Sequence, residues 1–124
     1  MTNDQEVTMN DDTTPGLIAL RIAKQAAGKT LRMARTIPAP LRCLADQVIR
    51  SSTSVSANLA EGAGRAGRDR IHHWRMAYAS ALETSTHIEE LVDDGAVDRK
   101  LATEILALED RVRALTWRLV NPRW

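Results

Sequence analysis

Three glycines near the middle of the chain have the spacing of a phosphate-binding loop. The pattern G-x-G-x-x-G is formed by Gly62, Gly64 and Gly67, and three cations accompany it: Arg65, Arg68 and Arg70. Such glycines bind a dinucleotide only where a β-strand precedes them and the pyrophosphate meets the start of the next helix. The preceding residues, 54–61, follow a helical spacing of apolar side chains. We therefore interpret the glycines as a turn between two helices and keep the arginines as candidate contacts to a phosphate backbone.

The other side chains that could do chemistry do not complete a site. His87 lies four residues after Glu83 and three before Glu90, a spacing that lets an imidazole and a carboxylate share a metal ion. Because no second pair of this kind occurs, a metal would need ligands from another subunit. The hydroxyl side chains of residues 51–56 lack the G-x-S-x-G sequence of a nucleophile, and Cys43 has no histidine near it in the sequence. We predict no metal, no cofactor, no small-molecule substrate and no catalysis; an enzyme with an inter-subunit metal at Glu83 and His87 is our third hypothesis.

The composition is that of one soluble globular domain. The chain has 124 residues, of which 44% are hydrophobic and 27% charged, enough to bury a core. Cys43 is the single cysteine, so no internal disulfide can form. The first residues lack the basic and apolar segments of a signal peptide, and no apolar run is long enough to cross a bilayer. These features predict a cytoplasmic protein without a membrane partner.

Charge is separated along the chain, although the net charge is only +1. Residues 1–16 carry a net charge of −4, residues 17–75 of +8, residues 76–98 of −6 and residues 99–124 of +3. One surface of the fold is therefore expected to be basic and another acidic. A basic surface favours binding to a polyanion, whereas two complementary surfaces also allow contact between subunits.

Apolar residues at three- and four-residue steps predict four amphipathic helices. We expect a disordered acidic tail over residues 1–15, a helical bundle over residues 16–121 and a frayed C-terminus over residues 122–124. Short connections at residues 38–40, 62–67 and 95 predict an all-α, up-down-up-down antiparallel four-helix bundle.

Each predicted helix has an apolar seam. In the first helix it consists of Leu20, Ala23, Ala27, Leu31 and Ala34. In the last helix it consists of Val97, Leu101, Ile105, Leu108, Val112, Leu115 and Leu119. Opposite the first seam lies a basic stripe of Arg21, Lys24, Arg32 and Arg35, with Lys29 close by. The third helix has a second, mixed face of Met76, Ser80, Glu83, His87 and Leu91, which predicts contact with two neighbours.

Polar residues also lie on the seam of the second predicted helix. Asn58 falls there, where a side-chain amide is costly unless it has a hydrogen-bond partner. We hypothesise that Asn58 and Glu61 form hydrogen bonds with the third helix and so fix its register.

Two segments resemble a known family. QVIRSSTSVSANLAEGAGR (residues 47–65) and RMAYASALE (residues 75–83) resemble the four-helix-bundle proteins encoded within 23S rRNA intervening sequences. They are more distantly similar to the accessory variability proteins of diversity-generating retroelements. The matching positions are Gln47, Arg50, Asn58, Ala60, Glu61, Gly62, Arg65, Ala77, Ser80 and Glu83. The resemblance implies a bundle that assembles into a ring, most often a homopentamer, without catalysis and with a role in binding structured nucleic acid.

These observations predict a homo-oligomeric, non-enzymatic bundle that binds RNA or DNA through basic surfaces. The residues that we expect to contact nucleic acid are Arg21, Lys24, Arg32, Arg35, Arg65, Arg68 and Arg70. A structural polar motif is assigned to Asn58, Glu61, Gly62, Ser80 and Glu83. The alternative is a scaffold whose charged surfaces serve only contacts between proteins.

Overall fold

The computed structural model describes residues 14–122, and all regular structure in that range is helical. The helices are α1 (Thr14–Ala34), the 3-10 turn η2 (Ala39–Leu41), α2 (Arg42–Ala63), α3 (Gly67–Asp94) and α4 (Arg99–Val120). The predicted all-helical fold with four packed helices is confirmed, including the helical assignment of the serine-rich segment. Most of the predicted acidic tail (residues 1–13) and the end of the predicted frayed C-terminus (residues 123–124) lie outside the described range.

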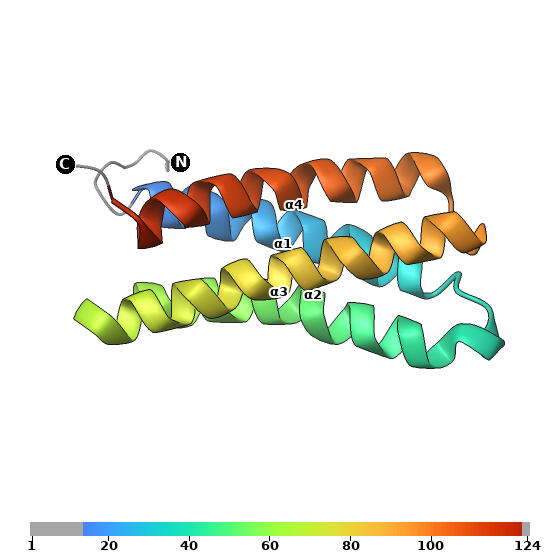
Figure 1. The fold of residues 1–124 in the computed structure, drawn as a ribbon, viewed down its shortest axis with the longest axis horizontal. Helices are drawn as coiled ribbons and strands as arrows, with labels where there is room; N and C mark the ends of the chain where they lie inside the picture. Colours follow the sequence, from blue (N-terminus) through green and yellow to red (C-terminus); the bar gives the residue numbers. More distant parts are fainter. Residues whose placement is uncertain (1–13, 123–124) are drawn as a thin grey trace, which may run out of the picture.

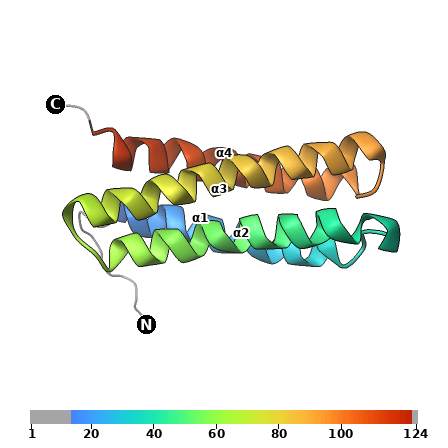
Figure 2. The same ribbon diagram turned by 60° about the horizontal axis from the view of Figure 1, so that its bottom comes forward.

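Each of the four long helices packs against two neighbours. Helices α1 and α3 both contact α2 and α4 and do not contact each other, so they lie diagonally opposite in the bundle. Figures 1 and 2 show the long axes nearly aligned, with the α2–α3 turn at one end and the α1–α2 and α3–α4 connections at the other. The first turns of α1 therefore lie at the same end as the glycine-rich turn.

The helices begin and end where local chemistry favours it. Helix α1 begins at Thr14, two residues before the predicted boundary, and Pro15 stands in its first turn, where a missing N–H costs no hydrogen bond. Helix α3 ends at Gly95, whose φ of 79° is the left-handed conformation that glycine adopts without strain. Asp98 caps α4, because its side chain accepts a hydrogen bond of 2.8 Å from the N–H of Leu101.

The core consists of two apolar clusters that follow each other along the bundle. The first cluster, at the end with the α2–α3 turn, includes Ala23, Val55, Leu59, Trp74, Ala81 and Val112. The second includes Met33, Val48, Ile88, Leu91 and Ile105. None of the helices between residues 14 and 120 is long and apolar enough to cross a membrane.

Two predicted seams differ from the buried faces. Leu31 is 36% exposed, and α1 instead buries a face of mainly small residues: Ala19, Ile22, Ala23, Ala26, Ala27, Thr30, Met33 and Ala34. Helix α4 buries Ala102, Ile105, Glu109, Val112, Thr116 and Val120, while the predicted Leu101, Leu108, Leu115 and Leu119 are half-buried. Leucine side chains are long enough to reach the core from the flanks of a face, whose centre in α4 holds mainly β-branched side chains. Leu91, predicted on the second, mixed face of α3, is fully buried.

Helices α2 and α3 approach each other closely at Gly62. A Cβ atom on Gly62 would lie 2.6 Å from both Cδ1 and Nε1 of Trp74, well inside van der Waals contact. The indole is 9% exposed, and its N–H donates a hydrogen bond of 3.4 Å to the carbonyl oxygen of Leu59. The missing side chain at residue 62 thus lets the indole lie directly on the backbone of α2.

We expect Gly62→Ala to lower the free energy of unfolding by about 1–3 kcal/mol, because the indole must move to admit the methyl group. The matched control is Gly28→Ala in α1, where the nearest atom to a new Cβ lies 4.0 Å away. Alanine is favoured over glycine inside a helix by about 1 kcal/mol, so this control should gain stability. Urea denaturation of both variants tests the prediction, and an equal gain at both positions would contradict it.

Candidate functional site

Arg65 in the glycine-rich turn is neutralised by two carboxylates. Its Nε donates a hydrogen bond of 2.8 Å to Glu61 Oε2, and its Nη1 donates one of 2.6 Å to Asp69 Oδ2. The hydrogen bond from Arg65 lowers the pKa of the Asp69 carboxyl. Because this bridge joins the end of α2 to the first turn of α3, a phosphate would have to compete with both carboxylates for the guanidinium.

Arg70 is also engaged inside the turn. Its Nε donates a hydrogen bond of 3.0 Å to the carbonyl oxygen of Gly62, and its Nη2 donates one of 3.3 Å to that of Ala63. Its guanidinium lies 5.4 Å from the centre of the Trp74 ring. Arg70 thus caps the last carbonyls of α2 with a positive charge. Arg68, in contrast, is exposed and forms no hydrogen bond or ion pair with any residue from 14 to 122.

The glycines themselves form a turn, as predicted. Gly62 belongs to the last turn of α2, and Gly64 follows as its C-cap, with its N–H directed at the carbonyls of Ala60 and Glu61. Gly67 has a φ of 60° and is the first residue of α3. Since a helix and not a strand leads into these glycines, the crevice of a dinucleotide-binding fold does not form here.

The basic stripe on α1 is the larger group of available cations. Arg21, Lys24, Arg32 and Arg35 are all exposed, and none of the ion pairs within residues 14–122 includes them. Lys29 differs from them, because its Nζ lies 3.1 Å from Glu104 Oε1 on α4. Arg21, Lys24 and Arg32 span about 16 Å of α1 at 1.5 Å per residue, and Arg35 directly follows the end of the helix.

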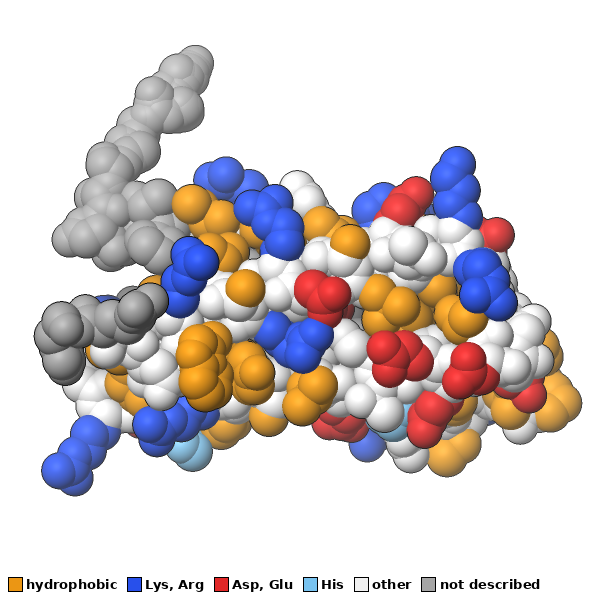
Figure 3. All heavy atoms as spheres, turned by 45° about the horizontal axis from the view of Figure 1, so that its top comes forward, with side chains coloured by type: hydrophobic (Ala, Val, Ile, Leu, Met, Phe, Trp, Pro, Cys, Tyr) orange, Lys and Arg blue, Asp and Glu red, His pale blue; other side chains and the backbone are white. Residues whose placement is uncertain are grey.

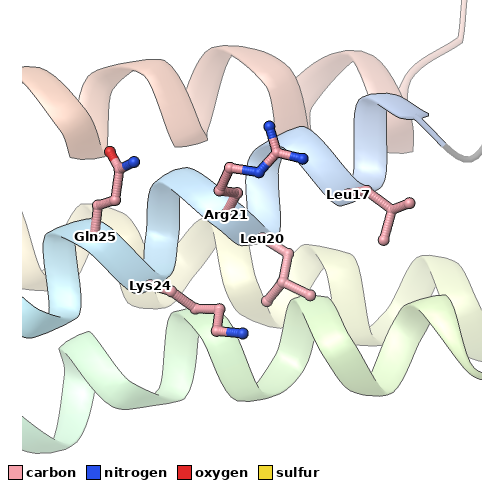
Figure 4. A pocket seen from close by; sticks show the side chains of 5 residues that line it. All are labelled: Leu17, Leu20, Arg21, Lys24 and Gln25. Atoms are coloured by element: carbon pink, nitrogen blue, oxygen red, sulfur yellow. The ribbon is translucent and has the colours of Figure 1, made fainter. Parts of the chain in front are cut away.

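A shallow hollow marks the first half of the stripe. It has a volume of about 490 Å³ and is lined by Leu17, Leu20, Arg21, Lys24 and Gln25. Figure 4 shows Arg21 and Gln25 on the side of α1 that faces α4, and Leu20 and Lys24 on the side that faces α2. Arg21 and Lys24 therefore flank a hollow that is apolar in part. An anion bound in the hollow could contact a cation on either side.

The seven predicted nucleic-acid contacts do not form one cluster. The turn arginines lie at one end of the bundle, where α1 begins, while Arg32 and Arg35 lie near the opposite end, where α1 finishes. On the face in Figure 3, acidic side chains gather in the half away from the α2–α3 turn, and basic side chains occur in both halves. The stripe thus consists of two pairs of cations, one toward each end of α1, whereas only Arg68 of the turn remains unpaired within the described helices.

The predicted polar motif lies on the α2–α3 interface, where three hydrogen bonds form a polar ladder. They join Ser51 to Thr84 at 2.9 Å, Ser54 to Ser80 at 3.0 Å, and Asn58 Oδ1 to His73 Nδ1 at 3.0 Å. Asn58 also donates to the carbonyl and hydroxyl oxygens of Ser54, each at 3.0 Å. Asn58 thus contacts α3 directly, as hypothesised.

Glu61 and Glu83, the acids of the motif, are exposed and do not join the ladder. Glu61 reaches α3 only through Arg65. Glu83 Oε2 lies 3.3 Å from His87 Nε2, and Glu90 Oε1 lies 3.4 Å from His87 Nδ1. Both imidazole nitrogens therefore face carboxylates of their own helix, and the part of the chain described here contains no set of three His, Cys, Asp or Glu side chains arranged to hold a metal ion.

Sequence reasoning missed Glu109, which lies in the core of the bundle. Its side chain is 1% exposed, and neither carboxylate oxygen has a hydrogen-bond partner among residues 14–122. Burial raises its pKa from 4.5 to about 8, against a smaller opposing effect of Arg113. The signal was its spacing, four residues after Ile105 and three before Val112, which puts a carboxyl on the apolar face.

We expect Arg70→Ala to destabilise the protein by about 1–2 kcal/mol, because two helix-end carbonyls lose a charged donor. Arg68→Ala removes the same charge from the same turn and should change stability by less than about 0.5 kcal/mol. Thermal unfolding of the two variants at one salt concentration measures the difference. Equal losses for both would show that the capping contact is not what stabilises the turn.

Comparisons with known proteins agree with this architecture. A search of curated proteins finds no match to the chain. Among solved structures, the fold is similar to that of a protein of unknown function from the S23 ribosomal protein family of Bacteroides thetaiotaomicron. The TM-score is 0.78 and the identity 19%, and the match covers 86% of this chain and 98% of that one. The sequence matches the 23S rRNA-intervening sequence proteins over residues 16–117, and the chain belongs to that family.

Proposed function

We propose that this chain is a non-enzymatic, homo-oligomeric bundle that binds the phosphate backbone of structured RNA or DNA. The observation that carries the proposal is the stripe of exposed cations along α1 and just past its end. It consists of Arg21, Lys24, Arg32 and Arg35, and no acidic side chain of residues 14–122 forms an ion pair with them. The family, named for intervening sequences of 23S rRNA, supports RNA as the first ligand to test.

The length of the stripe suits a nucleic-acid backbone. Successive phosphates along one strand advance by about 3.4 Å, so the stretch of about 16 Å from Arg21 to Arg32 would face roughly five of them. Contacts of this kind neutralise phosphates without reading bases, so binding should depend steeply on salt and weakly on sequence. Arg68 at the turn could extend the contact, whereas Arg65 and Arg70 have internal partners.

The α3–α4 face supports assembly into oligomers. Trp117 on α4 is 54% exposed and lies 5.7 Å from the ring of Tyr78, and Leu82 on α3 is 46% exposed. Large apolar side chains that gather at the surface of a small domain often mark a contact with another protein. In the proposed assembly, an up-down-up-down bundle repeats as a ring, with five copies as the expected number, and several α1 stripes act together on one nucleic acid.

We expect the quadruple variant R21Q/K24Q/R32Q/R35Q to lose RNA binding. Fluorescence anisotropy with a labelled RNA hairpin and a DNA duplex measures affinity over a series of salt concentrations. With four phosphate contacts, log K should fall with log salt with a slope of about −3 to −4, and the variant should lose that slope.

The matched control removes four exposed cations elsewhere, Arg50, Arg75, Arg99 and Arg118, and so has the same net charge. This control should retain most of the affinity and the salt slope. Equal losses in the two variants would assign the binding to net charge and not to α1. If the unaltered protein binds neither nucleic acid at low salt, the scaffold alternative replaces the proposal.

We expect Trp117→Lys to shift the protein toward smaller oligomers, because a charge would replace the most exposed aromatic side chain of the α3–α4 face. Leu31→Lys, on α1, is the control and should leave the assembly unchanged. Light scattering gives the molar mass of each variant, and circular dichroism checks that the helices persist. Dissociation by the Leu31 change alone would place the subunit contact on α1 instead.

A further inference from the structure

A polar layer separates the two apolar clusters of the core. On every helix the buried residues between the buried members of the first and second cluster are small or polar, and neither cluster includes them. We define the polar layer as the buried polar residues at that level: Thr30, Ser51, Ser52, Thr84, Ser85 and Glu109. The other buried residues of α1 at this level are Ala26 and Ala27. One carboxyl therefore lies midway along the bundle among hydroxyl and methyl groups.

Half of the layer has internal partners and half does not. Thr30 and Thr84 donate to backbone carbonyls of their own helices at 2.8 Å each, and Ser51 pairs with Thr84. The hydroxyls of Ser52 and Ser85 and both oxygens of Glu109 have no partner among the residues described. A carboxylate in such surroundings loses its hydration, and no hydrogen bond compensates for that loss.

The charged groups that act on Glu109 both belong to its own helix. Arg113 favours the carboxylate and Asp110 disfavours it, and Arg113 directs its Nη2 at Asp110. Helices α1, α2 and α3 contribute only alanine, serine and threonine side chains to the layer, and none of the charges found to act on Glu109 within the described residues belongs to them. Burial is the largest influence, and it favours the neutral acid.

We propose that the polar layer is a proton-binding site, and that folding of the bundle is linked to uptake of one proton from solvent by the Glu109 carboxyl. The neutral acid has one O–H donor, retains an acceptor oxygen and carries no charge that needs hydration, so its burial costs less than that of the carboxylate. When the proton leaves to solvent, a carboxylate remains between two apolar clusters and weakens the contact of α4 with the other three helices.

The direction of the pH dependence follows from the two states of Glu109. Its pKa is about 8 in the folded bundle and 4.5 in the exposed chain, so between these values the folded state holds a proton that the unfolded state has lost. Stability therefore falls as pH rises through this window and levels off above it. One proton corresponds to about a tenfold loss in the folding equilibrium constant per pH unit.

The experiment is urea denaturation of the full chain from pH 5 to pH 9. In the unaltered protein the contribution of Glu109 should lower the folding constant by about three orders of magnitude over this range. Glu109→Gln keeps the size of the side chain and removes the proton equilibrium, so this contribution should vanish and the variant should be the more stable protein at pH 9. Glu89→Gln, a change at an exposed carboxyl of α3, is the matched control and should follow the unaltered protein.

A second measurement needs no substitution. The chain has seven glutamates, and carboxyl-labelled glutamate gives one ¹³C signal for each. One glutamate signal of the folded protein should titrate near pH 8. Parallel pH profiles for the unaltered protein and Glu109→Gln would overturn the proposal, and so would the absence of any glutamate signal that titrates in the alkaline range.

Discussion

The close contact between α2 and α3 is the constraint on which the arrangement of this bundle depends. The missing side chain of Gly62 lets the Trp74 indole lie on the backbone of α2, and the same contact holds the short turn in place. Further along, the polar ladder repeats the pairing of the two helices at three levels, so that any shift of one helix along the other would break several hydrogen bonds at once. Two helices held in this register provide the surface on which α1 and α4 pack.

The same turn explains why nearby cations differ in what they can bind. Arg65 and Arg70 are close in sequence to Arg68, yet the first bridges two carboxylates and the second caps the end of α2. A guanidinium that already donates to carboxylates or helix-end carbonyls has fewer N–H groups left for a phosphate, which would have to compete for the rest. The cations of the α1 stripe form no such internal contacts. The buried face of α1 consists mainly of small residues, and the cations lie on the opposite face, where solvent or a ligand can reach them.

Local sequence patterns predict where the helices lie along the chain, but they do not predict fully which face of each helix is buried. Glycines and prolines mark the connections, and three- and four-residue steps define the helices, so the four elements and the turn at residues 62–67 followed from the chain alone. The neighbouring helices decide which residues of α1 and α4 are buried. For this reason the spacing wrongly predicts a buried Leu31 and does not single out Glu109 as a buried residue. Asn58 could be assigned a partner on α3 because a polar residue on a seam requires one. The internal partners of Arg65 and Arg70 depend on the exact geometry of the turn, which spacing does not specify.

The basic stripe and the polar layer are connected through α1, although each is proposed on separate observations. Arg21 and Lys24 project from the part of α1 that packs into the first apolar cluster, while Arg32 and Arg35 flank residues of the second. The layer lies between these pairs, so the spacing of all four cations depends on the two halves of the core remaining in register. A nucleic acid that contacts both pairs would bind the closed bundle more tightly than a loosened one. By linkage it would then favour the protonated form of Glu109 and raise the pH at which the bundle opens.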